Sequence, residues 1–335
     1  MNHKIEQNAD KTRRVRGAVI TGFTFALTLA ISAYLLINFS KSNSVAFGSF
    51  WFLVFLPAYL CAIICYVADP KGDKPPIFYW SVPLIFTSIV VLGSLFFLQE
   101  GVICLVMLSP LWLAFGWLGA FIMHRQLRRP RNPNILHSTL VFLPLLSGGI
   151  ESQIPISHEH ISVSREIIID ATPQEIWPYT ISNAYIKDDE GRWNFTQNVL
   201  GLPRPRATIL SGEGKGAVRT AFWGDQINFN EKITQWQPGR LLSWSFAFPN
   251  RSLQDHTDKH ISPDGQFLKI DSGNYKLTPL TPETTLVSLR TNYVAKTHVN
   301  SYAAFWGEIL IGDIHNNVLA IIKQRAEINH SRNAK

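Results

Sequence analysis

The sequence predicts an α-helical membrane domain followed by an α+β domain in which a curved antiparallel sheet wraps a long C-terminal helix. Three observations lead to this fold class. Long apolar runs fill the chain before residue 150, period-two alternation begins near residue 158, and one long helical pattern closes the chain at 300–327. A length of 335 residues fits two domains.

The charges divide at the same place. Residues 1–150 carry twelve Lys and Arg against five Asp and Glu, a net charge of +7, and the whole chain is also +7, so that residues 151–335 sum to zero. The basic excess flanks the apolar runs, which is the positive-inside pattern of a multi-pass membrane protein. It therefore gives no argument for nucleic-acid binding, and we expect a cytoplasmic N-terminus, residues 1–16, in a cell (inner) membrane.

The expected membrane domain covers residues 17–150. Runs of about 17–39, 47–68, 77–98 and 101–123 are each long enough to span a bilayer. No charged residue lies deep inside them, which favours an anchor or a lipid-facing platform over a transporter.

A shorter run at 135–150 decides the side on which the rest of the chain lies. Four arginines lie just before this run, and no Lys or Arg follows it until Arg165. This asymmetry favours a fifth span and an extracytoplasmic C-terminal domain. A re-entrant or interfacial segment is the alternative, because the run is short.

Residue types argue against a metal or cofactor site. The cysteines, Cys61, Cys65 and Cys104, all lie in apolar runs, where free cysteine packs as a small hydrophobe. The HEH run at 158–160 offers two histidines, and two ligands do not make a zinc site. We therefore expect neither metal nor cofactor.

The C-terminal domain is expected at 158–327, with a tail at 328–335. Its first strand, HISVSREIIID, leads to a helix start at which Thr172 can cap, Pro173 fits the first position and Glu175 supplies an acid. Strand-like runs separated by turn signals follow, and a helix closes the domain, with an apolar stripe of Trp306, Leu310, Ile314, Val318 and Ile321. The runs lie near 206–211, 216–224, 228–237, 240–248, 265–279 and 284–295.

The runs VSREIIIDATPQEIW and NEKITQWQPGRLLSW, together with the long final helix, resemble the START-like helix-grip superfamily, also called SRPBCC or polyketide cyclase/dehydrase and lipid-transport-like. GLPRPRATILSGEGKGAVRT, DKHISPDGQF and THVNSYAAFW resemble an uncharacterised branch fused to membrane helices. The resemblance implies an apolar cavity between the sheet and the long helix. The fold hosts carriers, sensors, cyclases and hydrolases, so it does not fix the function.

Strand alternation predicts which side chains face inward. The inward set is Val218, Thr220, Phe222, Phe229, Glu231, Ile233, Leu242, Trp244, Phe246, Val287, Leu289, Thr291 and Tyr293, to which the helix adds Trp306 and Leu310. The lining is aromatic and suits an apolar or amphiphilic ligand. A filled core without a cavity is the alternative. The ligand-binding candidates are Phe222, Phe229, Glu231, Trp244, Phe246, Arg219, Arg290, Tyr293 and Trp306.

Glu231 is the polar exception on this face, because a buried carboxylate needs a partner or a raised pKa. Arg219, Arg290, His260 and His298 are its candidate partners. Either an ion pair joins two strands, or Glu231 anchors a ligand or acts as an acid or base. Glu231, His260 and His298 are accordingly weak catalytic candidates. Asp313 lies off the helix stripe and is expected to be solvated or paired.

Three functions fit these patterns: a membrane-anchored domain that binds a lipid or other hydrophobic ligand, a cyclase/aromatase-type enzyme, and a membrane sensory or interaction protein. The first is favoured by an aromatic lining beside a membrane anchor. The partners it implies are the lipid bilayer and a hydrophobic small molecule, and not nucleic acid. The sequence leaves the oligomeric state open.

Overall fold

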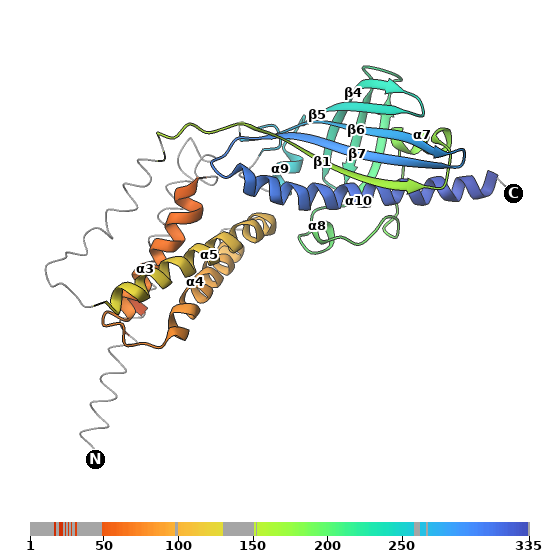
Figure 1. Ribbon diagram of the computed structural model, residues 1–335. Helices are drawn as coiled ribbons and strands as arrows, with labels where there is room; N and C mark the ends of the chain where they lie inside the picture. The colour runs from red at the N-terminus through yellow and green to blue at the C-terminus, as the bar shows by residue number, and fades with distance from the viewer. Residues whose placement is uncertain are drawn as a thin grey trace, which may run out of the picture. The chain divides into compact units, whose positions relative to one another are not determined.

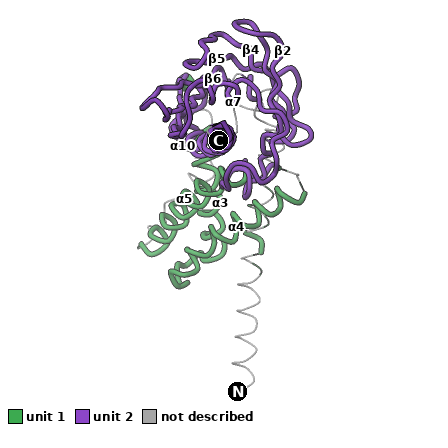
Figure 2. Tube along the Cα trace, turned by 90° about the vertical axis from the view of Figure 1, so that its right-hand side faces the viewer, with its two compact units in different colours: residues 1–100, 104–156 green, residues 101–103, 157–335 purple. Residues whose placement is uncertain are grey.

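The computed structural model describes residues 49–97, 100–129, 151, 153–257, 262–265 and 267–333, with isolated positions between 17 and 31. The chain divides into two compact units, residues 1–100 with 104–156 and residues 101–103 with 157–335 (Figure 2).

The first unit is helical. Its elements are η1 (Trp51–Phe55), α3 (Leu56–Ala68), α4 (Pro76–Phe97) and α5 (Val102–Leu127). Among the described residues, three helical stretches are long and apolar enough to cross a membrane: Trp51–Ala68, Pro76–Phe97 and Val102–Leu127. They correspond to the expected runs at 47–68, 77–98 and 101–123. The expected fifth span, and all but isolated positions of the first, lie outside the described residues.

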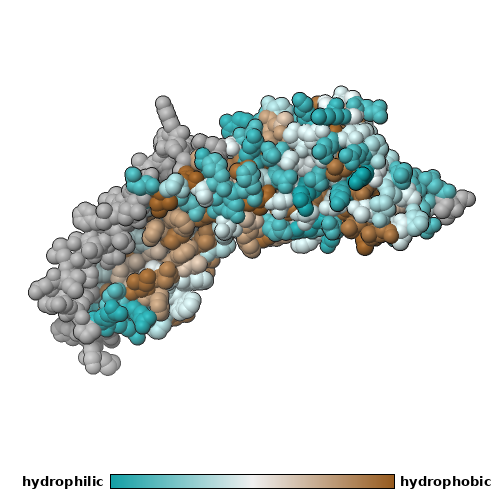
Figure 3. Space-filling model, turned by 45° about the horizontal axis from the view of Figure 1, so that its top comes forward, coloured by the Kyte–Doolittle hydropathy of each residue, from teal (hydrophilic) through white to brown (hydrophobic). Residues whose placement is uncertain are grey.

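Small residues let these helices pack closely. A Cβ atom at Gly119 of α5 would overlap the Ala58 carbonyl of α3, and one at Gly116 would lie 3.1 Å from both Cys61 Sγ and Pro83 Cβ. Close backbone approach through glycine is typical of helices packed in a membrane. Large apolar side chains such as Phe96 and Phe97 remain exposed, and brown surface covers much of this unit in Figure 3.

The second unit is the expected α+β fold. A seven-stranded antiparallel sheet, in the order β1-β7-β6-β5-β4-β3-β2, curves around the long helix α10 (Figures 1 and 2). The strands are β1 (Glu159–Ile169), β2 (Pro205–Ser211), β3 (Val218–Trp223), β4 (Ile227–Gln237), β5 (Leu241–Ala247), β6 (Leu268–Thr281) and β7 (Thr284–Ala295). The helices are α7 (Pro173–Ile181), α8 (Phe195–Asn198), α9 (Ser252–Asp255) and α10 (Asn300–Asn333).

Local sequence fixes where α7 begins. Thr172 Oγ1 accepts a hydrogen bond from the Glu175 backbone N–H, and the Glu175 carboxylate accepts one from the Thr172 N–H. This capping box satisfies two helix N–H groups that would otherwise lack partners, and Pro173 occupies the first helical position as expected.

Helix α10 differs from the expectation in two ways. It continues to Asn333, six residues beyond the predicted end at 327. Its buried stripe includes His315, Leu319, Ile322 and Ala326, whereas Ile314 and Val318 of the predicted stripe are only half-buried. Trp306 and Ile321 of the predicted stripe are buried as expected, but apolar periodicity could not identify the buried His315.

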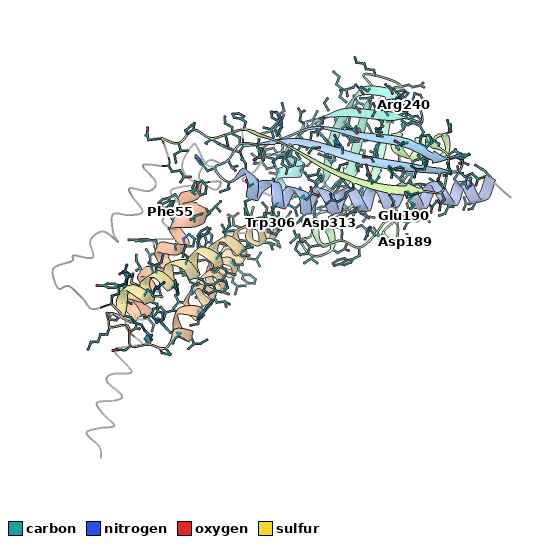
Figure 4. The ribbon with its side chains drawn as sticks, viewed as in Figure 1. Phe55, Asp189, Glu190, Arg240, Trp306 and Asp313 are labelled. Atoms are coloured by element: carbon teal, nitrogen blue, oxygen red, sulfur yellow. The ribbon has the colours of Figure 1, made fainter. Side chains whose placement is uncertain are left out.

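Polar groups hold the segment between α7 and β2 along α10. Asp313 accepts hydrogen bonds from the Thr196 N–H and hydroxyl, as expected for a paired rather than a catalytic carboxylate. Farther along α10, Asn317 accepts one from the Arg192 N–H, and Arg325 forms an ion pair with Glu190. Figure 4 shows Asp313 on α10 and Glu190 in the segment beside it.

The first prediction concerns Gly273, which faces the inside of the sheet. A Cβ atom there would lie 2.5 Å from Cζ2 of the Trp244 ring, which covers this glycine. Gly273→Ala should therefore lower the free energy of unfolding by about 1–3 kcal/mol through overpacking. Thermal unfolding of the full chain in detergent measures this, with Ser245→Ala on the outer face of β5 as control. An unchanged transition would contradict the position of Trp244.

Candidate functional site

The inner face of the sheet, the one turned toward α7 and α10, carries the candidate site. Alternation along β4 buries Ile227, Phe229, Glu231 and Ile233 and leaves the residues between them more exposed. Glu231 therefore lies on the inner face, where strand alternation predicts it.

Glu231 is paired with Arg219. The two residues lie opposite each other on β4 and β3, and Arg219 Nε donates to Glu231 Oε2 at 2.5 Å. Arg219 Nη1 also donates to the carbonyl of Thr180 at the end of α7. The expectation of a cationic partner within reach of Glu231 is thus confirmed.

Two aromatic rings flank the Arg219 guanidinium. Its Cζ atom lies 4.4 Å from the centroid of the Trp244 ring and 5.4 Å from that of the Tyr275 ring. The rings offer a cation–π attraction, which strengthens when the cation is removed from water. Arg219 and Glu231 are only 3% and 6% exposed.

Burial and pairing act against each other on these two charges. Desolvation opposes the charge on Arg219, but Glu231 outweighs it, so that the pKa of Arg219 lies above its ordinary value. Burial also raises the pKa of Glu231, although Arg219 opposes that shift. The higher pKa of Arg219 favours its charged form, whereas the higher pKa of Glu231 favours its neutral form. The guanidinium charge is the firmer of the two, because arginine does not lose its proton in proteins, and it holds the carboxylate ionised beside it.

His315 is the second buried polar group, and it comes from α10. Its Nε2 atom lies 2.8 Å from Thr291 Oγ1 on β7, and its Nδ1 atom is buried without a hydrogen-bond partner among the described residues. Desolvation, helped by the nearby Arg165, lowers the pKa of His315 from 6.5 to about 3. The imidazole is therefore neutral at physiological pH, and its nitrogens can donate one hydrogen bond and accept another.

These four residues occupy the boundaries between three apolar clusters. Arg219 of β3 lies between Ala217 and Ala221, and on β4, Glu231 lies between Phe229 and Ile233. On β7, Thr291 lies between Leu289 and Tyr293. On α10, His315 lies between Ile311 and Leu319. In each case the apolar neighbours on the two sides belong to different clusters. We call Arg219, Glu231, Thr291 and His315 the polar belt.

Two further buried polar atoms, on strands β5 and β7, lack hydrogen-bond partners among the described residues. The Trp244 Nε1 and Tyr293 Oη atoms are buried and unpaired. Tyr293 is 3% exposed, and its hydroxyl lies against Gly307 of α10, where a Cβ atom would overlap it. Burial raises the pKa of Tyr293 to about 12, with Glu308 and Glu159 adding to the shift, so the hydroxyl keeps its proton.

The other sequence-predicted residues fall in several places. Phe229 and Phe246 lie on the inner face with ring centroids 6.0 Å apart, in the aromatic cluster near α9. Trp306 is buried near the start of α10 (Figure 4). Its ring meets that of Tyr302 edge to face. His298 is half-buried in the turn before α10, and His260 lies outside the described residues.

Two of the predicted ligand-binding residues, Phe222 and Arg290, do not lie on the inner face. Phe222 faces the other side of the sheet, because β3 turns Arg219, Ala221 and Trp223 inward in place of Val218, Thr220 and Phe222. Arg290 is exposed on the outer face, because it lies between the inward residues Leu289 and Thr291.

Sequence reasoning missed His315 and Tyr275 as site residues. Tyr275 is two residues from Gly273 on β6, and both face inward. For His315, the available signal was its spacing of four from Ile311 and Leu319, which places it on one helix face with them.

No protein-family model matches the chain, and a search of curated proteins finds no significant match. Solved structures with similarity include a norcoclaurine synthase from Thalictrum flavum, with 12% identity over 53% of this chain and 99% of that chain and a TM-score of 0.33. An aromatase/cyclase from Streptomyces sp. R1128 is 13% identical over 53% of this chain and 97% of that chain, with a TM-score of 0.32. These likenesses transfer neither an activity nor site residues to this chain.

The second prediction concerns pH. Because His315 titrates near pH 3 in the folded state and near 6.5 in the unfolded state, only the unfolded state takes up this proton between those values. The wild-type protein should therefore be most stable above about pH 6.5 and lose up to ~1.4 kcal/mol of unfolding free energy per pH unit below it through this group.

His315→Gln removes this contribution, so the stability difference between wild type and variant should shrink as the pH falls from about 7 to about 4. Denaturant unfolding of the full chain at each pH gives the measurement. His160→Gln, at an exposed position on β1, should keep the wild-type slope. Parallel curves for wild type and His315→Gln would show that His315 is not buried in its neutral form.

Proposed function

We propose that the C-terminal unit binds a hydrophobic or amphiphilic ligand against the inner face of its sheet, and that the apolar helices anchor it in a membrane. One observation carries the proposal: within the described part of the chain, Trp244 Nε1, Tyr293 Oη and His315 Nδ1 are buried without hydrogen-bond partners in largely apolar surroundings. A buried polar atom without a partner costs free energy, and native proteins seldom leave one without a reason such as a ligand or a bound water.

The surroundings fit an apolar ligand body. Aromatic rings from β4, β5 and β6 lie on the inner face, with Trp244 5.2 Å from Tyr275 and 6.1 Å from Phe246 between ring centroids. Ligand pockets combine such apolar walls with a few convergent polar groups that orient the ligand. The polar belt supplies groups of that kind.

A cyclase/aromatase-type enzyme is the alternative, and it needs acid–base groups that can exchange protons near neutral pH. The Glu231 carboxylate is already bound by Arg219, and His315, with a pKa of about 3, is a weak base. These two assignments favour binding over proton transfer.

The membrane anchor gives such a domain a source of ligand. Three described helices have the length and apolar composition of membrane spans. Tethering raises the local concentration of the binding domain at the bilayer, where an apolar ligand is concentrated. We place the C-terminal unit on the extracytoplasmic side of a cell (inner) membrane, from the charge asymmetry around residues 135–150.

The third prediction tests ligand binding. The full chain, purified in mild detergent, should carry an apolar compound that native mass spectrometry detects on the intact protein and solvent extraction recovers. Thr291→Trp should reduce the bound compound by about tenfold, because the bulkier indole would exclude the ligand from the inner face beside His315.

The matched control is Arg290→Trp, which adds the same indole to the exposed outer face one residue away. It should leave the bound compound unchanged. A wild-type protein that carries no compound would contradict the proposal, as would equal occupancy in the two variants. Chemical conversion of the recovered compound by the protein would favour the enzymatic alternative.

A further inference from the structure

We infer that the polar group of the ligand is uncharged, a hydroxyl or a carbonyl, and not a carboxylate, a phosphate or an ammonium. The inference rests on the proposed ligand binding and specifies the chemical class of the ligand. The charges already present on the inner face, and the polar atoms that remain unpaired there, carry it.

The positive charge of the inner face is already neutralised. Arg219 is the only Lys or Arg among the described residues whose whole side chain is buried. Its Nε bonds to Glu231, its Nη1 to the Thr180 carbonyl, and the Trp244 and Tyr275 rings lie over it. An anionic headgroup would have to share this guanidinium with Glu231, and two carboxylates beside one cation leave one negative charge uncompensated in a dry site.

The negative charge is neutralised in the same way. Glu231 is the carboxylate of the polar belt, and its Oε2 atom accepts a hydrogen bond from Arg219. An ammonium group would compete with Arg219 for this single carboxylate and leave an excess positive charge. The belt therefore has no net charge to offer to a ligand of either sign, and burial of an unpaired charge is strongly unfavourable.

The inward basic residue of β1 is occupied too. Arg165 forms an ion pair with Glu308 of α10 at 2.6 Å and also donates to the Glu308 carbonyl. Its guanidinium lies against Gly312, so that the helix itself covers this charge. Arg165 consequently offers no free cation to the inner face.

The unpaired atoms suit a neutral polar group. Trp244 Nε1 can only donate, Tyr293 Oη can donate or accept, and a neutral imidazole donates from one nitrogen and accepts at the other. The Thr291 hydroxyl contacts the other ring nitrogen, Nε2, and can donate a hydrogen bond to it or accept one from it. Either tautomer of His315 therefore keeps this hydrogen bond. A hydroxyl needs one acceptor and one donor, and a carbonyl needs a donor, so these atoms satisfy both groups without adding charge.

A set of lipids with matched chains tests the inference. Binding of labelled hexadecanol to the full chain in detergent is competed with hexadecanol, hexadecanoic acid and hexadecylamine at about pH 8, where the acid and the amine are ionised. We expect the alcohol to bind about tenfold more tightly, or better, than either charged lipid. Equal or tighter binding of the acid or the amine would overturn the inference and leave ligand binding intact. If none of the three binds, the proposed function fails, and the inference fails with it.

Glu231→Gln gives the sharper test, because it leaves the buried Arg219 without its carboxylate at nearly unchanged volume. The preference should reverse, with hexadecanoic acid binding about tenfold more tightly than hexadecanol. Glu308→Gln, which breaks the more exposed ion pair with Arg165, is the matched control and should keep the wild-type order. An unchanged order in a folded Glu231→Gln protein would overturn the inference. If this variant does not fold, the affinities of the wild-type protein decide alone.

Discussion

The buried ion pair between Arg219 and Glu231 constrains the rest of the C-terminal unit. Two charges that are 3% and 6% exposed must be opposite each other, and the direct register of β3 against β4 places them so. Removing one partner of such a pair typically costs about 3–5 kcal/mol, because the other charge is left buried and uncompensated. Well-packed apolar residues could serve stability equally well at these positions. The pair therefore points to a requirement for polarity on the inner face.

The same pair connects the sheet to α7. Arg219 Nη1 donates to the carbonyl of Thr180, near the C-terminal end of that helix, where the last carbonyls have no partner within the helix. The N-terminal end of α7 is satisfied by its own capping box. One arginine thus compensates a carboxylate on the neighbouring strand and a free carbonyl of the helix above it, and it fixes the position of α7 on the inner face.

Much of this unit could be predicted from sequence. Alternation and turn residues located every strand within a few positions, and Thr172, Pro173 and Glu175 marked the start of α7, because these signals are local. The inward faces of β4, β5 and β7 were also correct, because apolar residues dominate them. Glu231 could be identified as an exception for the same reason.

The errors arose where a polar residue is buried and its partner is distant in sequence. The inward direction of β3 was wrong because its apolar residues Val218 and Phe222 were placed on the inner face. Arg219 was named as a candidate partner of Glu231, but the strand pairing that brings the two together places Arg219 itself on that face. The stripe of α10 was only partly correct, because His315 is buried against Thr291, a contact that only the packing of α10 on β7 creates. Arg290 was assigned to the site by charge alone, although its neighbours Leu289 and Thr291 already placed it on the outer face. Apolar periodicity reports burial driven by the hydrophobic effect, and it cannot report burial that depends on a partner.

The chemistry of the inner face and that of a bilayer share one constraint. A charged headgroup is costly on the inner face, because the one fully buried guanidinium among the described residues is already neutralised. It is also costly in the hydrocarbon core, which holds no water to solvate it. A neutral hydroxyl or carbonyl costs far less in both places. A domain of this kind, anchored by apolar helices, would therefore select those amphiphiles that can enter the hydrocarbon region and would discriminate against phospholipids, whose headgroups hold them at the surface. The selectivity would come from the ion pair between Arg219 and Glu231. Each of these residues already neutralises the other, so neither is free to compensate a charge on the ligand.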